Sequence, residues 1–111
     1  MDIIEKQDLY EAVWEKKGAV HQVNKFMEEM SELSKELFKA QKHNGDRTVD
    51  QTINDKVLEE FADVTICMEQ VRMKLMQLKT NSGESAYAVM LQHKEKKLER
   101  LKRTFTTDGN L

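Results

Sequence analysis

The stretch that decides the fold is VNKFMEEMSELSKEL, residues 23–37, in which apolar side chains recur every three or four residues. This spacing places them on one face of an α-helix. The pattern predicts a helix over about residues 20–43. It ends at Asn44-Gly45, because both residues tolerate the left-handed backbone that helix ends often adopt. The apolar positions are Val23, Phe26, Met27, Met30, Leu33 and Leu37.

A second long helix is expected after Thr48-Val49-Asp50-Gln51, which has the Thr-x-x-Gln form of a capping box. Its apolar residues alternate steps of four and three over about three heptads, a pattern that requires a partner helix. An antiparallel hairpin through residues 44–50 supplies that partner. The seam residues are Val57, Phe61, Val64, Met68, Val71, Leu75 and Leu78.

Two further helices complete the predicted fold. A short one covers about residues 5–16 and ends before Gly18, and another follows a break at residues 80–84, where Asn81 and Glu84 are candidate caps. We expect an all-α, antiparallel bundle of about four helices, in one domain over residues 1–111 with a frayed tail at 106–111. The apolar residues of the last helix are Tyr87, Met90, Leu91, Leu98, Leu101 and Phe105.

Composition agrees with long helices and narrows the function. Charged residues make up 34% of the chain, and there is no proline, so little interrupts a helix. So short a chain exposes much surface, and we expect oligomerisation to complete its core. The net charge of −2 argues against a general nucleic-acid binder. A single cysteine, a charged N-terminus and no long apolar run predict a soluble, cytoplasmic protein without a membrane partner.

Acidic residues flank the apolar faces of the two central helices in pairs. Glu29 and Glu32 are three residues apart on one helix, and Glu60 and Asp63 are three apart on the next. Each pair therefore shares a face, and both pairs fall at a similar distance from the predicted turn. Converging carboxylates repel one another unless a cation lies among them, and oxygen ligands favour Mg²⁺ or Mn²⁺.

Two other interpretations compete with a magnesium site. The acids can form a solvated face balanced by nearby lysines, or the helices can hold a di-iron centre, which also uses paired glutamates. The di-iron centre needs Glu-x-x-His on two helices, and none of the three histidines follows a glutamate by three residues. The balancing lysines are Lys25, Lys35, Lys39 and Lys56.

Glu28-Glu29-x-x-Glu32 followed by Glu60-x-x-Asp63 resembles the EExxE…ExxD signature of the MazG-like, all-α nucleoside triphosphate pyrophosphohydrolases. The resemblance covers roughly residues 14–79. It implies a homodimer or homotetramer that cleaves between the α- and β-phosphates with Mg²⁺, releasing a nucleoside monophosphate and pyrophosphate, typically to remove modified or surplus nucleotides. Supporting text includes Gln22-x-x-Lys25-Phe26 and Phe61-Ala62-Asp63-Val64.

The resemblance also implies roles for individual residues. Glu29, Glu32, Glu60 and Asp63 are the implied Mg²⁺ ligands, and Mn²⁺ is a possible substitute. Glu28, together with Glu29, is the implied catalytic acid pair, with Glu28 orienting or deprotonating the attacking water. The candidate substrate contacts are Gln22, Lys25, Trp14, Lys94 and Lys97.

Alternatives from another class remain open at the level of sequence. The same heptad seams fit a non-catalytic helical oligomer or adaptor, or a nucleotide-binding regulator that keeps the fold. The pattern does not choose the base or sugar, a dimer or a tetramer, the number of ions, or a cellular or viral origin.

Overall fold

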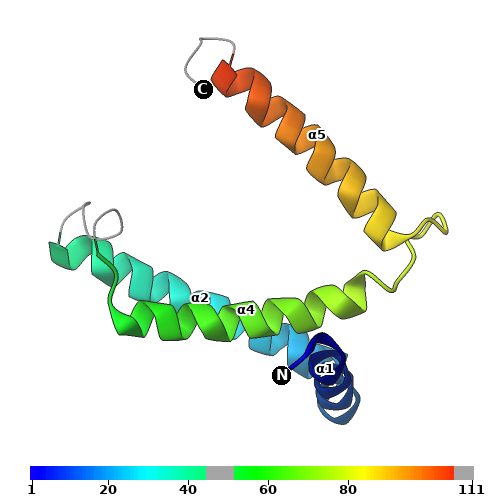
Figure 1. Ribbon diagram of the computed structural model, residues 1–111, viewed down its shortest axis with the longest axis horizontal. Helices are drawn as coiled ribbons and strands as arrows, with labels where there is room; N and C mark the ends of the chain where they lie inside the picture. The colour runs from blue at the N-terminus through cyan, green and yellow to red at the C-terminus, as the bar shows by residue number, and fades with distance from the viewer. Residues whose placement is uncertain (45–51, 107–111) are drawn as a thin grey trace. The chain divides into compact units, whose positions relative to one another are not determined.

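The computed structural model describes residues 1–44 and 52–106 (Figure 1). Within them the secondary structure is helical, apart from one isolated bridge between Lys79 and Ser85, and the predicted all-helical class is confirmed. The chain divides into two compact units, Met1–Arg72 and Met73–Leu111. Of the helices described, none combines the length and apolarity needed to cross a bilayer. The helices are α1 (Ile3–Lys17), α2 (Ala19–Asn44), α4 (Asp55–Leu75) and α5 (Ala86–Thr106).

The first helix is longer than the sequence suggested, because a capping box starts it early. The Asp2 side chain accepts a hydrogen bond from the Glu5 backbone N–H at 2.8 Å, and the Glu5 carboxylate accepts from the Asp2 N–H. Together they satisfy two backbone donors that a helix start leaves unpaired. Lys16 and Lys17 in the last turn favour the negative end of the helix dipole.

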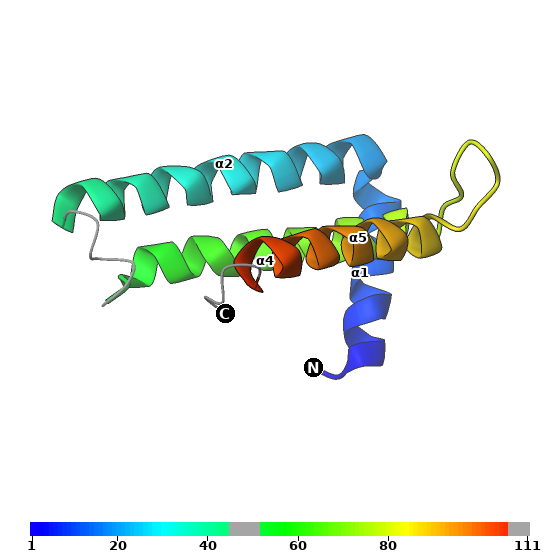
Figure 2. The ribbon, with the colours of Figure 1, turned by 90° about the horizontal axis from the view of Figure 1, so that it is seen from above.

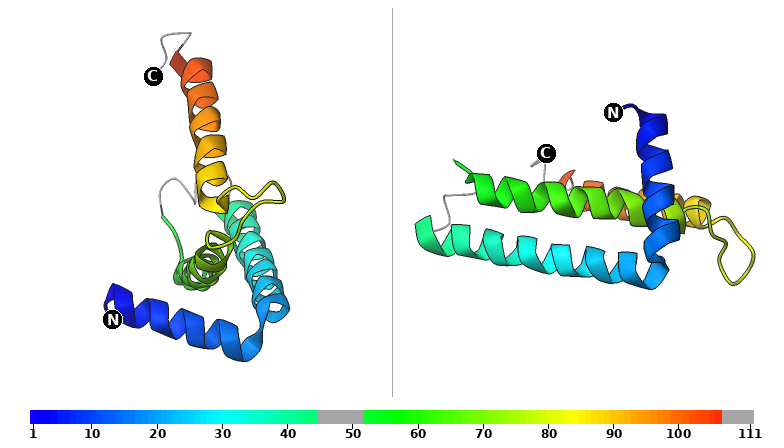
Figure 3. Two further views of the ribbon diagram at one scale, coloured as in Figure 1. Left: turned by 90° about the vertical axis from the view of Figure 1, so that its right-hand side faces the viewer. Right: turned by 90° about the horizontal axis from the view of Figure 1, so that it is seen from below.

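Gly18 makes the sharp junction between α1 and α2 that Figure 3 shows. Its backbone has φ 91° and ψ 159°, a conformation essentially restricted to glycine. The chain therefore leaves one helix and enters the next after a single residue. The Gly18 N–H still donates to the Trp14 carbonyl at 2.8 Å, which closes the end of α1.

Helices α2 and α4 run antiparallel and side by side (Figure 2), as the sequence predicted. The start of α4 differs from the expectation: residues 52–54 are not helical, and α4 begins at Asp55. Asn54 caps it, because its side-chain oxygen accepts from the Val57 N–H at 3.0 Å. The expected capping box at residues 48–51 and the expected Gly45 stop lie outside the described residues.

Polar contacts join α1 to α4 within the first unit. The Tyr10 hydroxyl of α1 donates to the Glu69 carboxylate of α4 at 3.0 Å, and Lys6 forms an ion pair with the same carboxylate at 3.1 Å. Few apolar residues are buried, and many large ones are exposed. A second subunit would cover these exposed apolar side chains. Oligomerisation therefore stays a prediction, which the small apolar core favours. The buried apolar residues are Tyr10, Ala40, Val57 and Val71.

The second unit consists of a tight turn followed by α5. The Thr80 N–H donates to the Glu84 carbonyl at 2.8 Å, and the Ser85 hydroxyl accepts from the Ala88 N–H at 3.3 Å. Ser85, rather than the expected Asn81 and Glu84, therefore caps α5. No residue of α5 is buried. The helix continues to Thr106, and the rest of the expected frayed tail lies outside the described residues.

Candidate metal centre

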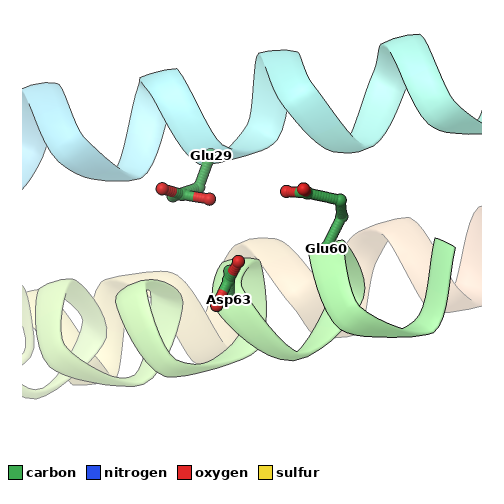
Figure 4. A group of neighbouring side chains, drawn as sticks. All are labelled: Glu29, Glu60 and Asp63. Atoms are coloured by element: carbon green, nitrogen blue, oxygen red, sulfur yellow. The ribbon is translucent and has the colours of Figure 1, made fainter. Parts of the chain in front are cut away.

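Three carboxylates converge between α2 and α4 (Figure 4). Glu29 projects from α2, and Glu60 and Asp63 project from α4 toward it. One carboxylate oxygen from each residue lies within 4.8 Å of the other two. Three oxygen donors this close to one another make the group a candidate site for a divalent cation.

A buried pair of amides fixes the register that brings these acids together. The Gln22 side chain donates to the Gln70 side-chain oxygen at 2.5 Å, joining α2 to α4, and both residues are buried. Gln22 precedes Glu29 by seven residues, and Gln70 follows Asp63 by seven. Because the helices are antiparallel, the same two turns separate the amide pair from the acids on each side. Glu29 therefore lies at the level of Asp63.

The cluster is partly sheltered and open on one side. The side chains of Glu29 and Glu60 are only 13% and 11% exposed, whereas Asp63 is exposed. Sheltering strengthens electrostatic interactions between carboxylates. The carboxylate of Asp63 is therefore accessible from solvent, whereas those of Glu29 and Glu60 are sheltered.

Two lysines partly neutralise the sheltered carboxylates. Lys25 contacts Glu29 at 3.0 Å and Lys56 contacts Glu60 at 3.0 Å, each pair spanning one helical turn. The hydrogen bond to its glutamate raises the pKa of each lysine, and the negative charge of that glutamate adds to the effect. Among residues 1–41 and 52–106, whose side chains the structure describes, no cationic group lies within ion-pair distance of Asp63.

Glu32 and Glu28 stand apart from the three converging acids. The Glu32 carboxylate forms an ion pair with Lys35 at 3.5 Å, and its side chain is 46% exposed. Glu28, the implied helper of the attacking water, is exposed. Sequence reasoning implied four ligands, and three of them meet in this structure; the roles of Glu32 and Glu28 remain predictions.

The candidate substrate contacts are distributed over both units. Gln22 is buried, and its side-chain nitrogen donates a hydrogen bond to Gln70. Its side-chain oxygen, Oε1, lies 3.0 Å from Nδ1 of His21. Lys25 reaches the cluster through Glu29, and Trp14 is half-buried on α1. Lys94 and Lys97 are exposed on α5 in the second unit. Of these five residues, the structure connects only Lys25 directly to the acidic cluster.

Cys67 lies one turn beyond Asp63 on α4 and is half-buried. Burial raises the pKa of its thiol, and the nearby Glu29 carboxylate raises that pKa further. The thiol is therefore neutral at physiological pH, which argues against a thiolate nucleophile at this position.

Sequence reasoning named Lys56 only as a lysine balancing a solvated acidic face, and it missed Gln70 altogether. The signal for Lys56 was present, because Lys56 precedes Glu60 by four residues just as Lys25 precedes Glu29. Gln70 carried no comparable signal, since its importance comes from a contact with a residue 48 positions away.

Comparisons with known proteins add no family assignment. No family model matches the chain, and no curated protein or solved structure matches it significantly.

The chemistry of the donor set indicates which metal would fit. Three carboxylates with no histidine or thiolate among them suit a hard ion such as Mg²⁺ or Mn²⁺ better than zinc or copper.

Proposed function

We propose that this chain is a Mg²⁺-dependent nucleoside triphosphate pyrophosphohydrolase that releases pyrophosphate and a nucleoside monophosphate. The observation that supports the proposal most is the convergence of Glu29, Glu60 and Asp63 from two helices. These are three of the five acids in the EExxE…ExxD pattern, and three of its four implied metal ligands. A donor set of three carboxylates also suits a hard divalent ion.

The residues of the chain provide binding and orientation. Glu29, Glu60 and Asp63 would hold the ion, and rotation of the exposed Glu32 side chain would add a fourth carboxylate. Bound Mg²⁺ neutralises phosphate charge and lowers the pKa of a coordinated water. Glu28 lies outside the ligand set, so its carboxylate is available to orient that water and accept its proton. Hydrolysis in this scheme depends on positioning and charge, and needs no protein nucleophile.

Phosphate groups not held by the ion require basic partners. Lys25 is adjacent to the cluster and is the main candidate. The proposed contacts for the base or sugar remain Trp14 and Gln22. The further proposed contacts for phosphate are Lys94 and Lys97 of α5. We further propose that the protein is cytoplasmic. We also propose a homodimer or homotetramer, because the small apolar core leaves large side chains such as Phe38 and Phe61 more than half exposed.

One observation favours a second candidate function, a non-catalytic helical adaptor. Apolar residues follow one face of α5 at heptad spacing and are all 40–54% exposed, which suits docking to another helix. An adaptor of this kind requires no intact acidic cluster. The residues of this face are Tyr87, Leu91, Leu98, Leu101 and Phe105.

Pyrophosphate release from a panel of common and modified nucleoside triphosphates, with Mg²⁺ and with EDTA, tests the proposal. We expect metal-dependent release with the monophosphate as co-product, and loss of release in Glu29→Gln and Asp63→Asn. Asp8→Asn, an exposed aspartate on α1, is the matched control and should retain activity. Silence of the folded wild-type protein across the panel would favour the adaptor.

A further inference from the structure

The two ion pairs at the cluster form a matched set that the sequence motif does not require. Lys25 and Lys56 each precede their glutamate by four residues, and each contact is 3.0 Å long. Both acceptors belong to the converging group of acids. One lysine comes from α2 and the other from α4, so each of the two helices contributes one such ion pair to the cluster.

These contacts differ from the other lysine–glutamate pairs on α2. Lys35–Glu32 and Lys39–Glu36 join residues three apart at 3.5 and 3.4 Å. Neither Glu32 nor Glu36 is among the converging acids. The lysine contacts to the two sheltered carboxylates of the cluster are therefore shorter than those that Lys35 and Lys39 make.

Charge counting shows what the lysines do without metal. Three carboxylates carry a charge of −3 and two lysines carry +2, so the cluster retains about one negative charge. Sheltered like charges repel strongly, and the lysines reduce that repulsion. They also reduce the attraction that the acids exert on a free divalent ion.

We propose that Lys25 and Lys56 are internal counter-ions that weaken binding of a free metal ion and favour its arrival as a metal–triphosphate complex. The inference rests on the proposed function and assigns Lys56 a role beside Lys25. Their side chains are 47% and 55% exposed, so each ammonium group can leave its carboxylate by rotating within solvent. Phosphate oxygens of the incoming complex then replace the carboxylate as hydrogen-bond acceptors.

An ordinary supporting role for the lysines predicts the opposite sign. Groups that hydrogen-bond to metal ligands usually orient them, and their removal typically weakens metal binding about 10–100-fold. A counter-ion competes with the metal instead, so its removal strengthens binding of the free ion. The sign of the change in metal affinity therefore separates the two roles.

Titration with Mn²⁺ alone and with the preformed Mn²⁺–tripolyphosphate complex provides the test. Lys25→Gln and Lys56→Gln are compared with wild-type protein and with Lys39→Gln, whose partner Glu36 lies outside the cluster. Each lysine variant should bind free Mn²⁺ about three- to tenfold more tightly, because one nearby positive charge has gone. The same variants should bind the complex more weakly, since a phosphate contact is lost.

Controls keep the result interpretable if a variant is less stable. Lys56→Arg keeps the positive charge and should bind free Mn²⁺ more weakly than Lys56→Gln does. Circular dichroism should show the same helical content in every protein. Lower or unchanged affinity of the glutamine variants for free Mn²⁺ would overturn the inference while leaving the metal site intact. Failure of the wild-type protein to bind either probe would refute the proposed function itself.

Discussion

Asp63→Asn separates a metal-binding cluster from a solvated acidic face, because Asp63 is the one converging acid without a cationic neighbour in the described residues. Replacing its carboxylate by an amide removes repulsion and breaks no ion pair. The substitution should therefore stabilise the metal-free protein, although it removes a group that the proposed reaction needs. A residue kept for packing would show the opposite response.

The expected magnitude follows from the separation of the acids. Two unit charges at 4.8 Å, the upper limit of the separation between these carboxylate oxygens, repel by about 0.9 kcal/mol at the dielectric constant of water. Asp63 has two such neighbours, Glu29 and Glu60, and each of them is already partly neutralised by a lysine. We therefore expect a gain of about 0.5–1 kcal/mol, which corresponds to a rise of about 2–4 °C in the melting temperature of a domain of this size.

Thermal unfolding in EDTA and in Mg²⁺ measures both halves of the prediction. Mg²⁺ at ten times its dissociation constant should stabilise the wild-type protein by about 1.4 kcal/mol and should have little effect on Asp63→Asn. Asp8→Asn should behave as wild type in both buffers. A lower melting temperature of Asp63→Asn in EDTA, or an undiminished response to Mg²⁺, would refute the electrostatic reasoning.

Two further predictions concern the contacts that hold the site in place. Gln70→Leu should lower the free energy of unfolding measured in urea by about 1–3 kcal/mol, because it removes the acceptor of the buried Gln22 side-chain nitrogen. The double variant Gln22→Leu/Gln70→Leu should recover part of that loss. Burial, followed by the hydrogen bond to Glu69, raises the pKa of Tyr10, so the protonated hydroxyl is favoured in the folded state. The contribution of Tyr10 to the free energy of unfolding should be complete below about pH 10 and lost as pH rises through the folded pKa. Between neutral and alkaline pH, the urea midpoint should therefore fall more for wild type than for Tyr10→Phe.

The extent of the long helices followed from local sequence, whereas their ends depended on contacts that periodicity does not encode. The apolar spacing within residues 23–37 predicted α2 nearly to its observed end at Asn44. The first helix begins two residues earlier than expected, because Asp2 and Glu5 cap it. Asn54 and Ser85 cap the later helices in place of the expected residues, since several polar side chains near each start can act as caps and periodicity does not choose among them.

The site was predictable to the extent that helical spacing determines which side chains share a face. Spacing placed Glu60 and Asp63 together, and the antiparallel hairpin brought Glu29 to their level. Spacing could not show that Glu32 turns toward Lys35 instead, because that choice depends on a side-chain rotation at an exposed position. It also could not find Gln70, whose partner is distant in sequence.

Taken together, the register contact and the acids explain why α2 and α4 would respond to metal as a pair. The buried Gln22–Gln70 contact draws the helices together, and two turns away the carboxylates of Glu29 and Asp63 push them apart. A small apolar core leaves little hydrophobic free energy to oppose that repulsion. A divalent cation would replace the repulsion by a cross-link at the same level. Binding and folding of this helix pair are then coupled, so a ligand that brings the ion stabilises the geometry that it needs.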